Sequence, residues 1–153
     1  MGIIISSFTG CGRSYFKNVY GKQAKIYDAV EELSEKNDLE TYFNTVMSEV
    51  DKNDIVFIDF SNNVRNVFEE NNIDFDVFYP SSERRGEFIE NQVRKRSNPK
   101  DIQNLDRYFD KMIEDIENDE SPNCYKHKLE NKGEFLGNTP LIMQYINNIK
   151  EKP

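Results

Sequence analysis

The residues with the clearest potential for chemistry lie near the start of the chain, where a short apolar run leads into a glycine turn. Residues 3–14 read Ile-Ile-Ile-Ser-Ser-Phe-Thr-Gly-Cys-Gly-Arg-Ser. They keep two fixed positions of the phosphate-binding pattern G-x-x-x-x-G-K-[ST], Gly12 and Ser14. Ser7 replaces the first glycine and Arg13 replaces the lysine. The pattern predicts a phosphate site; the alternative is a strand–turn–helix that needs its glycines only for tight packing.

The chemistry of such a turn depends mainly on its backbone. The N–H groups of a glycine-rich turn and of the next helix N-terminus bind phosphate oxygens whatever the side chains are. Arg13 keeps a positive charge for the β- and γ-phosphates, and the Ser14 hydroxyl is a suitable ligand for Mg²⁺. Cys11 lies where a helix N-terminus can lower the pKa of a thiol. The residues predicted to contact the phosphate-bearing ligand are Ser7, Thr9, Gly10, Cys11, Gly12, Arg13, Ser14 and Tyr15.

Length and charge restrict the classes of protein. The 153 residues, 37% hydrophobic and 31% charged, are enough for one domain with its own core. A net charge of −8 argues against a nucleic-acid binder, because a phosphate backbone calls for clustered lysine and arginine. The sequence has no apolar run of membrane-spanning length and no signal-peptide pattern, so we expect a cytosolic protein with no membrane partner. Cys11 and Cys124 are expected to be free thiols.

Alternating strands and helices are predicted to position these residues. Apolar and β-branched runs predict strands at residues 3–5, 24–28, 55–58, 75–79 and 124–129. Amphipathic spacing predicts helices at 13–20, 38–51, through 64–68, at about 82–96 and 99–118, and through 141–149. These crossovers imply an α/β fold with three layers, a parallel sheet of about five strands covered by helices on both faces. The consecutive helices at about 81–120 are predicted to form a lid inserted in this single domain, 1–153.

The predicted strands should bring several of the candidate residues to one edge of the sheet. Ligands of open α/β sheets bind at the carboxyl ends of the strands. The turn at 7–14, Asp28, Asp59 and the segment after Tyr79 all follow predicted strands. The sequence therefore predicts that four separate segments contribute to one site.

Three segments in this order resemble a known family. They are Ile3–Phe16, then Asp54–Asp59 followed by a helix with Val64 and Arg65, then Phe75–Pro80 leading into an arginine-rich helix. Together they resemble the small P-loop nucleoside and nucleotide kinases, particularly the compact ones found in bacteriophages, over nearly the whole chain. The resemblance implies a P-loop NTPase fold and transfer of the γ-phosphoryl group of ATP, with Mg²⁺, to a nucleoside or nucleoside monophosphate. A nucleotide and a small-molecule acceptor are the partners it implies, and the host cytoplasm is the compartment if the source is a phage.

Two carboxylates acquire roles under this hypothesis. Asp59 would bind Mg²⁺ together with Ser14, and its alternative is to cap the helix that begins near Ser61. Asp28 would accept a hydrogen bond from the acceptor or serve as its general base, and its alternative is to face solvent at the end of its strand.

The arginines are the candidate phosphate and substrate contacts. Arg65 would contact the acceptor, or would form a surface ion pair with Glu69 at i+4. Arg84 and Arg94 are ten residues apart and so share a helical face, from which they would grip phosphate when the lid closes, with Arg85 as a further contact. Ordinary pairs with nearby glutamates are the alternative. The catalytic candidates are Arg13, Asp28, Arg84 and Arg94.

Three functions remain open from the sequence. The first is an active kinase that uses ATP and Mg²⁺. The second is a catalytically weakened descendant that binds or sequesters a nucleotide, for which the changes at Ser7 and Arg13 are suited. The third is a viral interaction protein on the same fold, whose acidic surface contacts a partner protein.

Overall fold

One parallel sheet organises the protein. The structure is a computed structural model that describes residues 2–33 and 38–150. Its strands are β1 (Ile3–Ser7), β2 (Ile26–Asp28), β3 (Ile55–Ile58), β4 (Phe75–Pro80) and β5 (Cys124–Leu129). They follow the order β2-β3-β1-β4-β5, and every neighbouring pair is parallel. The predicted five-stranded parallel sheet is therefore confirmed, with β1 at its centre.

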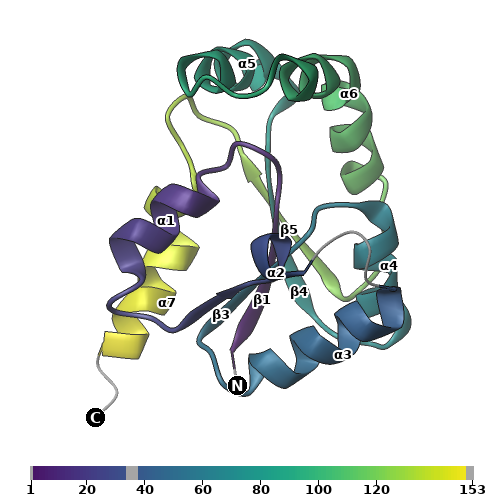
Figure 1. Ribbon diagram of the computed structural model, residues 1–153, viewed down its shortest axis with the longest axis vertical. Helices are drawn as coiled ribbons and strands as arrows, with labels where there is room; N and C mark the ends of the chain where they lie inside the picture. Colours follow the sequence, from purple (N-terminus) through teal and green to yellow (C-terminus); the bar gives the residue numbers. More distant parts are fainter. Residues whose placement is uncertain (1, 34–37, 151–153) are drawn as a thin grey trace.

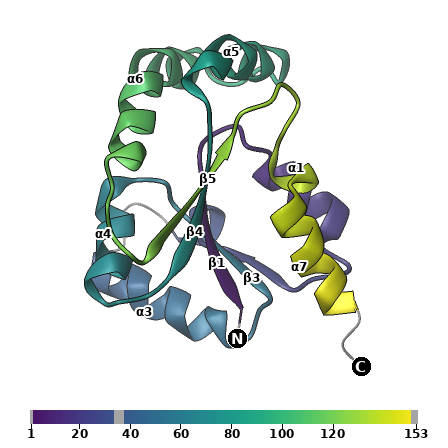
Figure 2. The same cartoon turned by 180° about the vertical axis from the view of Figure 1, so that it is seen from behind.

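Helices cover both faces of the sheet (Figures 1 and 2). On one face lie α1 (Arg13–Tyr20) and α7 (Pro140–Lys150), and on the other α3 (Leu39–Val50) and α4 (Asn62–Glu70). Beyond the carboxyl ends of the strands lie η1 (Ser82–Arg84), α5 (Arg85–Arg94) and the upper part of α6 (Pro99–Glu117). The short elements α2 (Ala29–Glu32) and η2 (Leu136–Asn138) complete the described part. The fold is thus a three-layer α/β fold.

The central strands are apolar because they are buried on both faces, as continuous apolar runs in parallel sheets are. Ile55–Ile58 is fully buried, and Ile5 of β1 lies between Phe57 of β3 and Asp76 of β4. The helix α3 begins at a capping side chain. Asp38 accepts a hydrogen bond from the Thr41 N–H at 2.7 Å, and this confirms the predicted start of α3.

An aromatic cluster holds α5 and α6 against the end of β1. Phe8 is 1% exposed, and its ring lies 5.0 Å from Phe109, 5.2 Å from Phe60 and 6.1 Å from Phe88 between centroids. Such edge-to-face contacts contribute beyond the area that they bury. The helical region over 81–120 is therefore packed on the domain in this structure. No helix in the described ranges has both the length and the apolar character needed to cross a membrane.

Candidate functional site

The glycine turn has a left-handed backbone at two positions. Gly10 and Gly12 both have φ of 91°, in the left-handed region that favours glycine. Gly10 also lies against α5, since a Cβ there would be 3.1 Å from the Phe88 ring and 3.2 Å from Nε2 of Gln92. The turn and α5 are thus in direct contact.

The N–H groups of this turn are available to a ligand. Gly12 is the N-cap of α1 and supplies no side-chain cap. Within the described chain, no acceptor is found for the N–H groups of Thr9, Gly10, Gly12, Arg13, Ser14 and Tyr15. The first N–H groups of a helix have no intrahelical partner and point toward any anion at that end. Thr9, Ser14 and Tyr15 are exposed residues, and Gly10, Gly12 and Arg13 are half-buried.

Arg13 is held by a buried carboxylate. Its Nε donates to Oδ2 of Asp28 at 2.8 Å, and Nζ of Lys17 donates to the same oxygen at 2.8 Å. The other oxygen of Asp28 accepts from the Val30 N–H at 3.0 Å and so caps α2. Asp28 is only 5% exposed, and the expectation that it faces solvent is wrong. An acceptor hydroxyl could reach this carboxylate only by displacing one of its cations.

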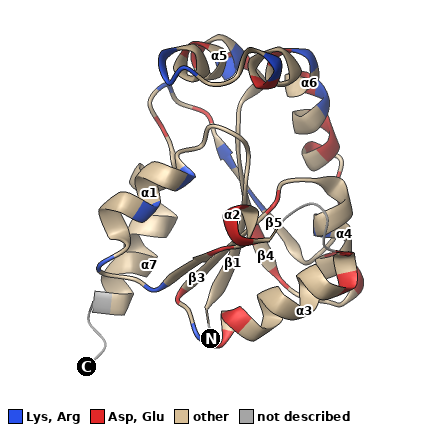
Figure 3. Cartoon of the chain, viewed as in Figure 1, with Lys and Arg blue, Asp and Glu red and all other residues tan. Residues whose placement is uncertain are grey.

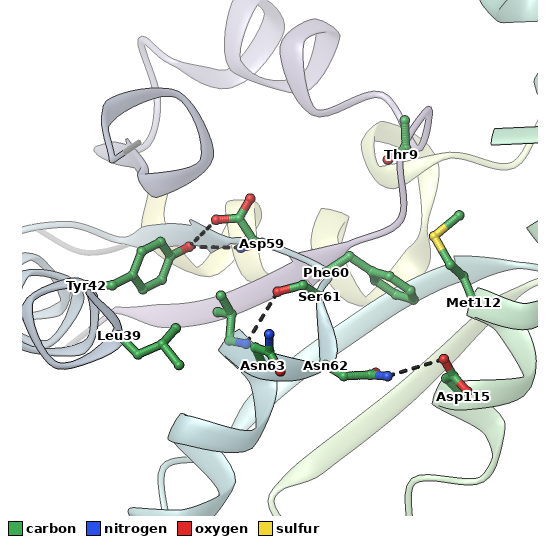
Figure 4. Close-up of a pocket in the computed structure, with 11 residues that line it drawn as sticks. Thr9, Leu39, Tyr42, Asp59, Phe60, Ser61, Asn62, Asn63, Met112 and Asp115 are labelled. Carbon is green, nitrogen blue, oxygen red and sulfur yellow. Dashed lines mark hydrogen bonds between the residues drawn. The ribbon is translucent and has the colours of Figure 1, made fainter. Parts of the chain in front are cut away.

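Asp59 lies directly after β3 and beside Tyr42 of α3 (Figure 4). The Tyr42 hydroxyl donates to Oδ2 of Asp59 at 2.7 Å and accepts from its N–H at 3.0 Å. Burial, together with the nearby Asp59, raises the pKa of Tyr42 well above its usual range, so the phenol stays protonated. The helix α4 is capped by the Ser61 hydroxyl, which accepts from the Val64 N–H at 3.3 Å. The alternative role of Asp59 as that cap is therefore wrong.

Arg65 is buried rather than exposed. It is 2% exposed and pairs with Asp119 at 3.0 Å, and its Nε donates to the Phe60 carbonyl at 3.0 Å. Its guanidinium also lies over the Phe60 ring, 5.2 Å from the centroid. The predicted surface pair with Glu69 is wrong, because the side chain turns inward to join α4 to the segment after α6.

Arg84 and Arg94 do not share a helical face. Arg84 is 5% exposed, makes two 2.8 Å hydrogen bonds with Glu87, and donates to the carbonyls of Leu129 and Glu134. Arg94 is exposed and pairs with Glu90 at 2.6 Å. The common face predicted for Arg84 and Arg94 is wrong, because α5 begins only at Arg85 and Arg84 lies in the preceding turn.

Arginines and carboxylates also pair elsewhere on α5 and α6. Arg85 pairs with Asp106 of α6 through its Nε at 3.0 Å. Figure 3 shows basic and acidic segments interspersed along α5 and α6. The alternative of ordinary ion pairs therefore describes Arg84, Arg85 and Arg94 in this structure.

Cys11 is buried below the turn. It is 1% exposed, and burial raises the pKa of its thiol to about 12, although the charge of Arg84 opposes that shift. The expectation of a lowered pKa is wrong, because desolvation of the buried thiol is the largest effect on it. Cys11 and Cys124 are both free, as predicted.

Two cavities include residues of the turn in their linings. The first, here called the Asp59 cavity, measures about 540 Å³ and is shown in Figure 4. Its lining residues are Thr9, Leu39, Tyr42, Asp59, Phe60, Ser61, Asn62, Asn63, Val64, Met112 and Asp115. The second, the Tyr15 cavity, measures about 410 Å³. Its lining residues are Gly10, Gly12, Tyr15, Val19, Tyr20, Asn91, Lys95, Phe135, Gly137 and Asn138.

Several lining residues were missed by sequence reasoning. No motif in the sequence singles out Tyr42, Asn62 or Asp115. Of the expected site residues, the structure brings Thr9 and Asp59 to one cavity and Gly10, Gly12 and Tyr15 to the other. Tyr15 is 67% exposed, whereas its neighbour Phe16 is fully buried.

Comparison with known proteins assigns neither a family nor a function. No protein-family model and no curated protein matches the chain. A solved structure of an uncharacterized protein from Eubacterium ventriosum ATCC 27560 is similar to it, with a TM-score of 0.49 and 14% sequence identity. That likeness covers 97% of this chain and 99% of the other.

Proposed function

We propose that this chain is a small-molecule phosphotransferase of the P-loop kinase type. It binds ATP at the glycine turn and transfers the γ-phosphoryl group to an acceptor, a nucleoside or nucleoside monophosphate in the family it resembles. The observation that carries the proposal is the position of the turn at the end of the central strand, where two separate cavities contact it, one at Thr9 and the other at Gly10, Gly12 and Tyr15. A transferase needs one cavity for each of two ligands, with the phosphates between them.

The Tyr15 cavity suits the base and sugar of the donor. The aromatic rings of Tyr15 and Phe135 offer surfaces on which a base can stack, and Asn91 and Asn138 offer amides for its polar edge. Gly10 and Gly12 line the same cavity, so a base held there has its phosphates beside the turn.

Arg13 is placed to contact those phosphates while remaining anchored. Only its Nε pairs with Asp28, and its two Nη groups have no partner within residues 2–33 and 38–150. Its side chain is 25% exposed. A guanidinium fixed at one nitrogen keeps the rest of its fork for a phosphate. Under this proposal Asp28 positions Arg13, and it is not the general base.

The oxygens near the turn fit a hard cation. Ser14 offers a hydroxyl and Asp59 a carboxylate, the ligand types that Mg²⁺ prefers beside phosphates. In the described ranges no three His, Cys, Asp or Glu side chains gather as a ready-made metal site, so phosphate oxygens and water would complete the coordination. When bound, Mg²⁺ supplies neutralisation of phosphate charge.

One observation favours a second function, nucleotide binding without transfer. Arg84, Arg85 and Arg94 each pair with a carboxylate, and Lys17 pairs with Asp28 and Glu31. Phosphoryl transfer depends on cations that stabilise the transition state. A site that keeps its backbone N–H donors can still bind the phosphates of a nucleotide. If its arginines and lysine stay paired with carboxylates, they do not stabilise the transition state, and phosphoryl transfer is slow.

A transfer assay separates these functions. The protein is incubated with γ-labelled ATP, Mg²⁺ and a panel of nucleosides and nucleoside monophosphates, beside the variants Arg13→Ala and Arg107→Ala. Arg107 is an exposed arginine of α6 and serves as the matched control. Label on an acceptor, lost in Arg13→Ala and kept in Arg107→Ala, supports the kinase. ATP binding without label on any acceptor supports the second function, and absence of ATP binding refutes both.

A further inference from the structure

We propose that Lys95 is a ligand-contacting residue of the Tyr15 cavity, where its ammonium binds the phosphates of a nucleotide from the side of α5. This inference rests on the proposed function, because it concerns the donor that the Tyr15 cavity would hold. The phosphate-binding pattern places a lysine in the turn itself, where this chain has Arg13. Lys95 would supply that mobile cation from a different helix.

The lining of the Tyr15 cavity carries positive charge in a protein whose net charge is −8. Among the described residues of the lining, Lys95 is the only one with a formal charge, and none is a carboxylate. The N–H groups of Gly10 and Gly12 have no acceptor within residues 2–33 and 38–150, and they add partial positive charge to the same cavity. An anionic ligand is therefore attracted to this cavity, whereas an uncharged one gains nothing from these charges.

Lys95 differs from several other cations near the turn because it forms no ion pair with any described residue. Arg13 and Lys17 of α1 both pair with the buried Asp28 at 2.8 Å, and Arg94 pairs with a glutamate of its own helix at 2.6 Å. Those cations can bind a phosphate fully only by weakening an existing pair. The Lys95 ammonium is available without that cost.

The helix α5 directs Lys95 toward the turn. One helical turn before it, the Gln92 side chain approaches the turn so closely that a Cβ on Gly10 would lie 3.2 Å from its Nε2. Asn91 and Lys95 are four residues apart and both line the Tyr15 cavity, as residues on one face of a helix do. The Lys95 N–H donates to the Asn91 carbonyl at 3.1 Å, so the backbone of Lys95 is fixed by the end of α5. From this fixed backbone, the flexible stem of a lysine lets its ammonium follow a phosphate.

The loop after β5 forms another wall of the cavity and is tied to α5 through Arg84. Arg84 donates to the Glu134 carbonyl at 2.8 Å, and its guanidinium lies 5.1 Å from the ring centroid of Phe135, which lines the cavity. Its ion-pair partner Glu87 accepts a further hydrogen bond from the backbone of this loop at 3.1 Å. The cavity of about 410 Å³ is therefore formed before a ligand binds, and its size is typical of small-molecule sites.

The competing explanation is that Lys95 is an ordinary exposed lysine that contributes only to solubility. Binding of ATP, ADP and adenosine is measured by calorimetry with Mg²⁺ and without an acceptor, at several salt concentrations. The proteins compared are the unmodified chain, Lys95→Gln, Lys95→Arg and Lys100→Gln. Lys100 is an exposed lysine of α6 outside the lining of the Tyr15 cavity, and it serves as the matched control.

Lys95→Gln should weaken the binding of ATP and ADP by about tenfold and that of adenosine by less than about twofold, because only the phosphates contact the ammonium. Lys95→Arg keeps the charge and should lose less affinity than Lys95→Gln, while Lys100→Gln should bind all three compounds as the unmodified chain does. Added salt should weaken ATP binding to the unmodified chain more than to Lys95→Gln.

The inference is overturned if Lys95→Gln binds ATP as tightly as the unmodified chain, or if it loses affinity for adenosine and ATP equally. Equal losses in Lys95→Gln and Lys95→Arg would also overturn it, because charge would then not be the cause. In these three cases ATP still binds and the proposed function stands. ATP binding that depends on Lys95, without transfer to any acceptor, would refute the phosphotransferase and leave this inference standing, whereas absence of ATP binding overturns both.

Discussion

The phenol of Tyr42 holds Asp59 through two hydrogen bonds, one with its side chain at 2.7 Å and one with its backbone N–H at 3.0 Å. Ser6 of β1 adds a third contact, donating to the Asp59 carbonyl at 3.2 Å. The end of β3 is thus fixed by a helix on one side and by the central strand on the other. These contacts place a carboxylate beside the glycine turn in the same cavity as Thr9.

Replacement of Tyr42 by phenylalanine tests this arrangement. The variant loses the bond to the carboxylate and leaves the Asp59 N–H without that acceptor, which should cost about 1–3 kcal/mol of unfolding free energy. Denaturant unfolding measures the change. Tyr125→Phe is the control, because Tyr125 is 51% exposed on the edge strand and should change stability by less than about 0.5 kcal/mol. Equal effects of the two substitutions would contradict the assigned role of Tyr42.

Alanine substitution at three different glycines should change the free energy of unfolding by different amounts. Gly10→Ala combines left-handed strain with a contact at 3.1 Å to Phe88, and should cost more than the roughly 1–2 kcal/mol of strain alone. Gly133→Ala has the same sign of φ and nothing within 4 Å, so it should show the strain alone. Gly86→Ala lies inside α5 with open space around it and should stabilise the protein by up to about 1 kcal/mol.

Thermal unfolding of the three variants gives the order of their stabilities. Gly86→Ala should be the most stable, Gly133→Ala intermediate and Gly10→Ala the least. If Gly10→Ala were as stable as Gly133→Ala, the close packing of the turn against α5 would be absent in solution.

The raised pKa of Glu69 should make the stability of the protein depend on pH. Burial raises its pKa to about 7, and a hydrogen bond with Asp119 adds to the shift. One of its oxygens, Oε1, is buried and has no hydrogen-bond partner in the described part of the chain. Between its ordinary value near 4.5 and about 7, the folded state holds more protons than the unfolded state at this site, so Glu69 lowers stability as pH rises.

Glu69→Gln removes this titration. Relative to the unmodified chain, the variant should gain about 1 kcal/mol between pH 5 and pH 8, an amount reduced by solvent screening. Glu70→Gln, at the exposed neighbouring position, should show no such trend. Urea unfolding at several pH values measures both differences, and parallel curves for the unmodified chain and Glu69→Gln would disprove the raised pKa.

Removal of the Arg65 side-chain charge should strongly lower the free energy of unfolding. Arg65→Met leaves Asp119 without its buried cation, and breaking a buried pair on one side costs about 3–5 kcal/mol. Arg94→Met removes an exposed i,i+4 pair and should cost about 0.5 kcal/mol or less. Chemical denaturation distinguishes them, and a small effect at Arg65 would mean that Asp119 finds another partner.

The fold could largely be predicted from the sequence because its signals are local. Ile55–Ile58 is a continuous apolar run, and Cys124–Leu129 alternates as an edge strand does; both have the predicted bounds. The helix α2 was missed, because four residues are too few for a helical period to appear. The sequence also placed the turn, Asp28 and Asp59 at one edge of the sheet, since parallel strands all end there.

The pairing of polar side chains could not be predicted in the same way. Arg65 meets Asp119, 54 positions away, and Asp59 meets Tyr42, 17 positions away, through turns that no local spacing describes. The spacing of Arg65 and Glu69 suggested an i,i+4 pair, but it did not show that this face of α4 is buried. Tyr42 is buried on the inner face of α3, while the role of its hydroxyl depends on where β3 ends.

The most direct test of the central claim is a titration of the ¹⁵N-labelled protein with Mg²⁺–ATP, followed through its amide resonances. We expect saturable shifts that are largest at the N–H groups of Gly10, Gly12, Arg13 and Ser14, and that are lost in Gly10→Ala but kept in Gly133→Ala. Amides that do not respond, or shifts that are confined to other parts of the protein, would show that the glycine turn is not a phosphate site.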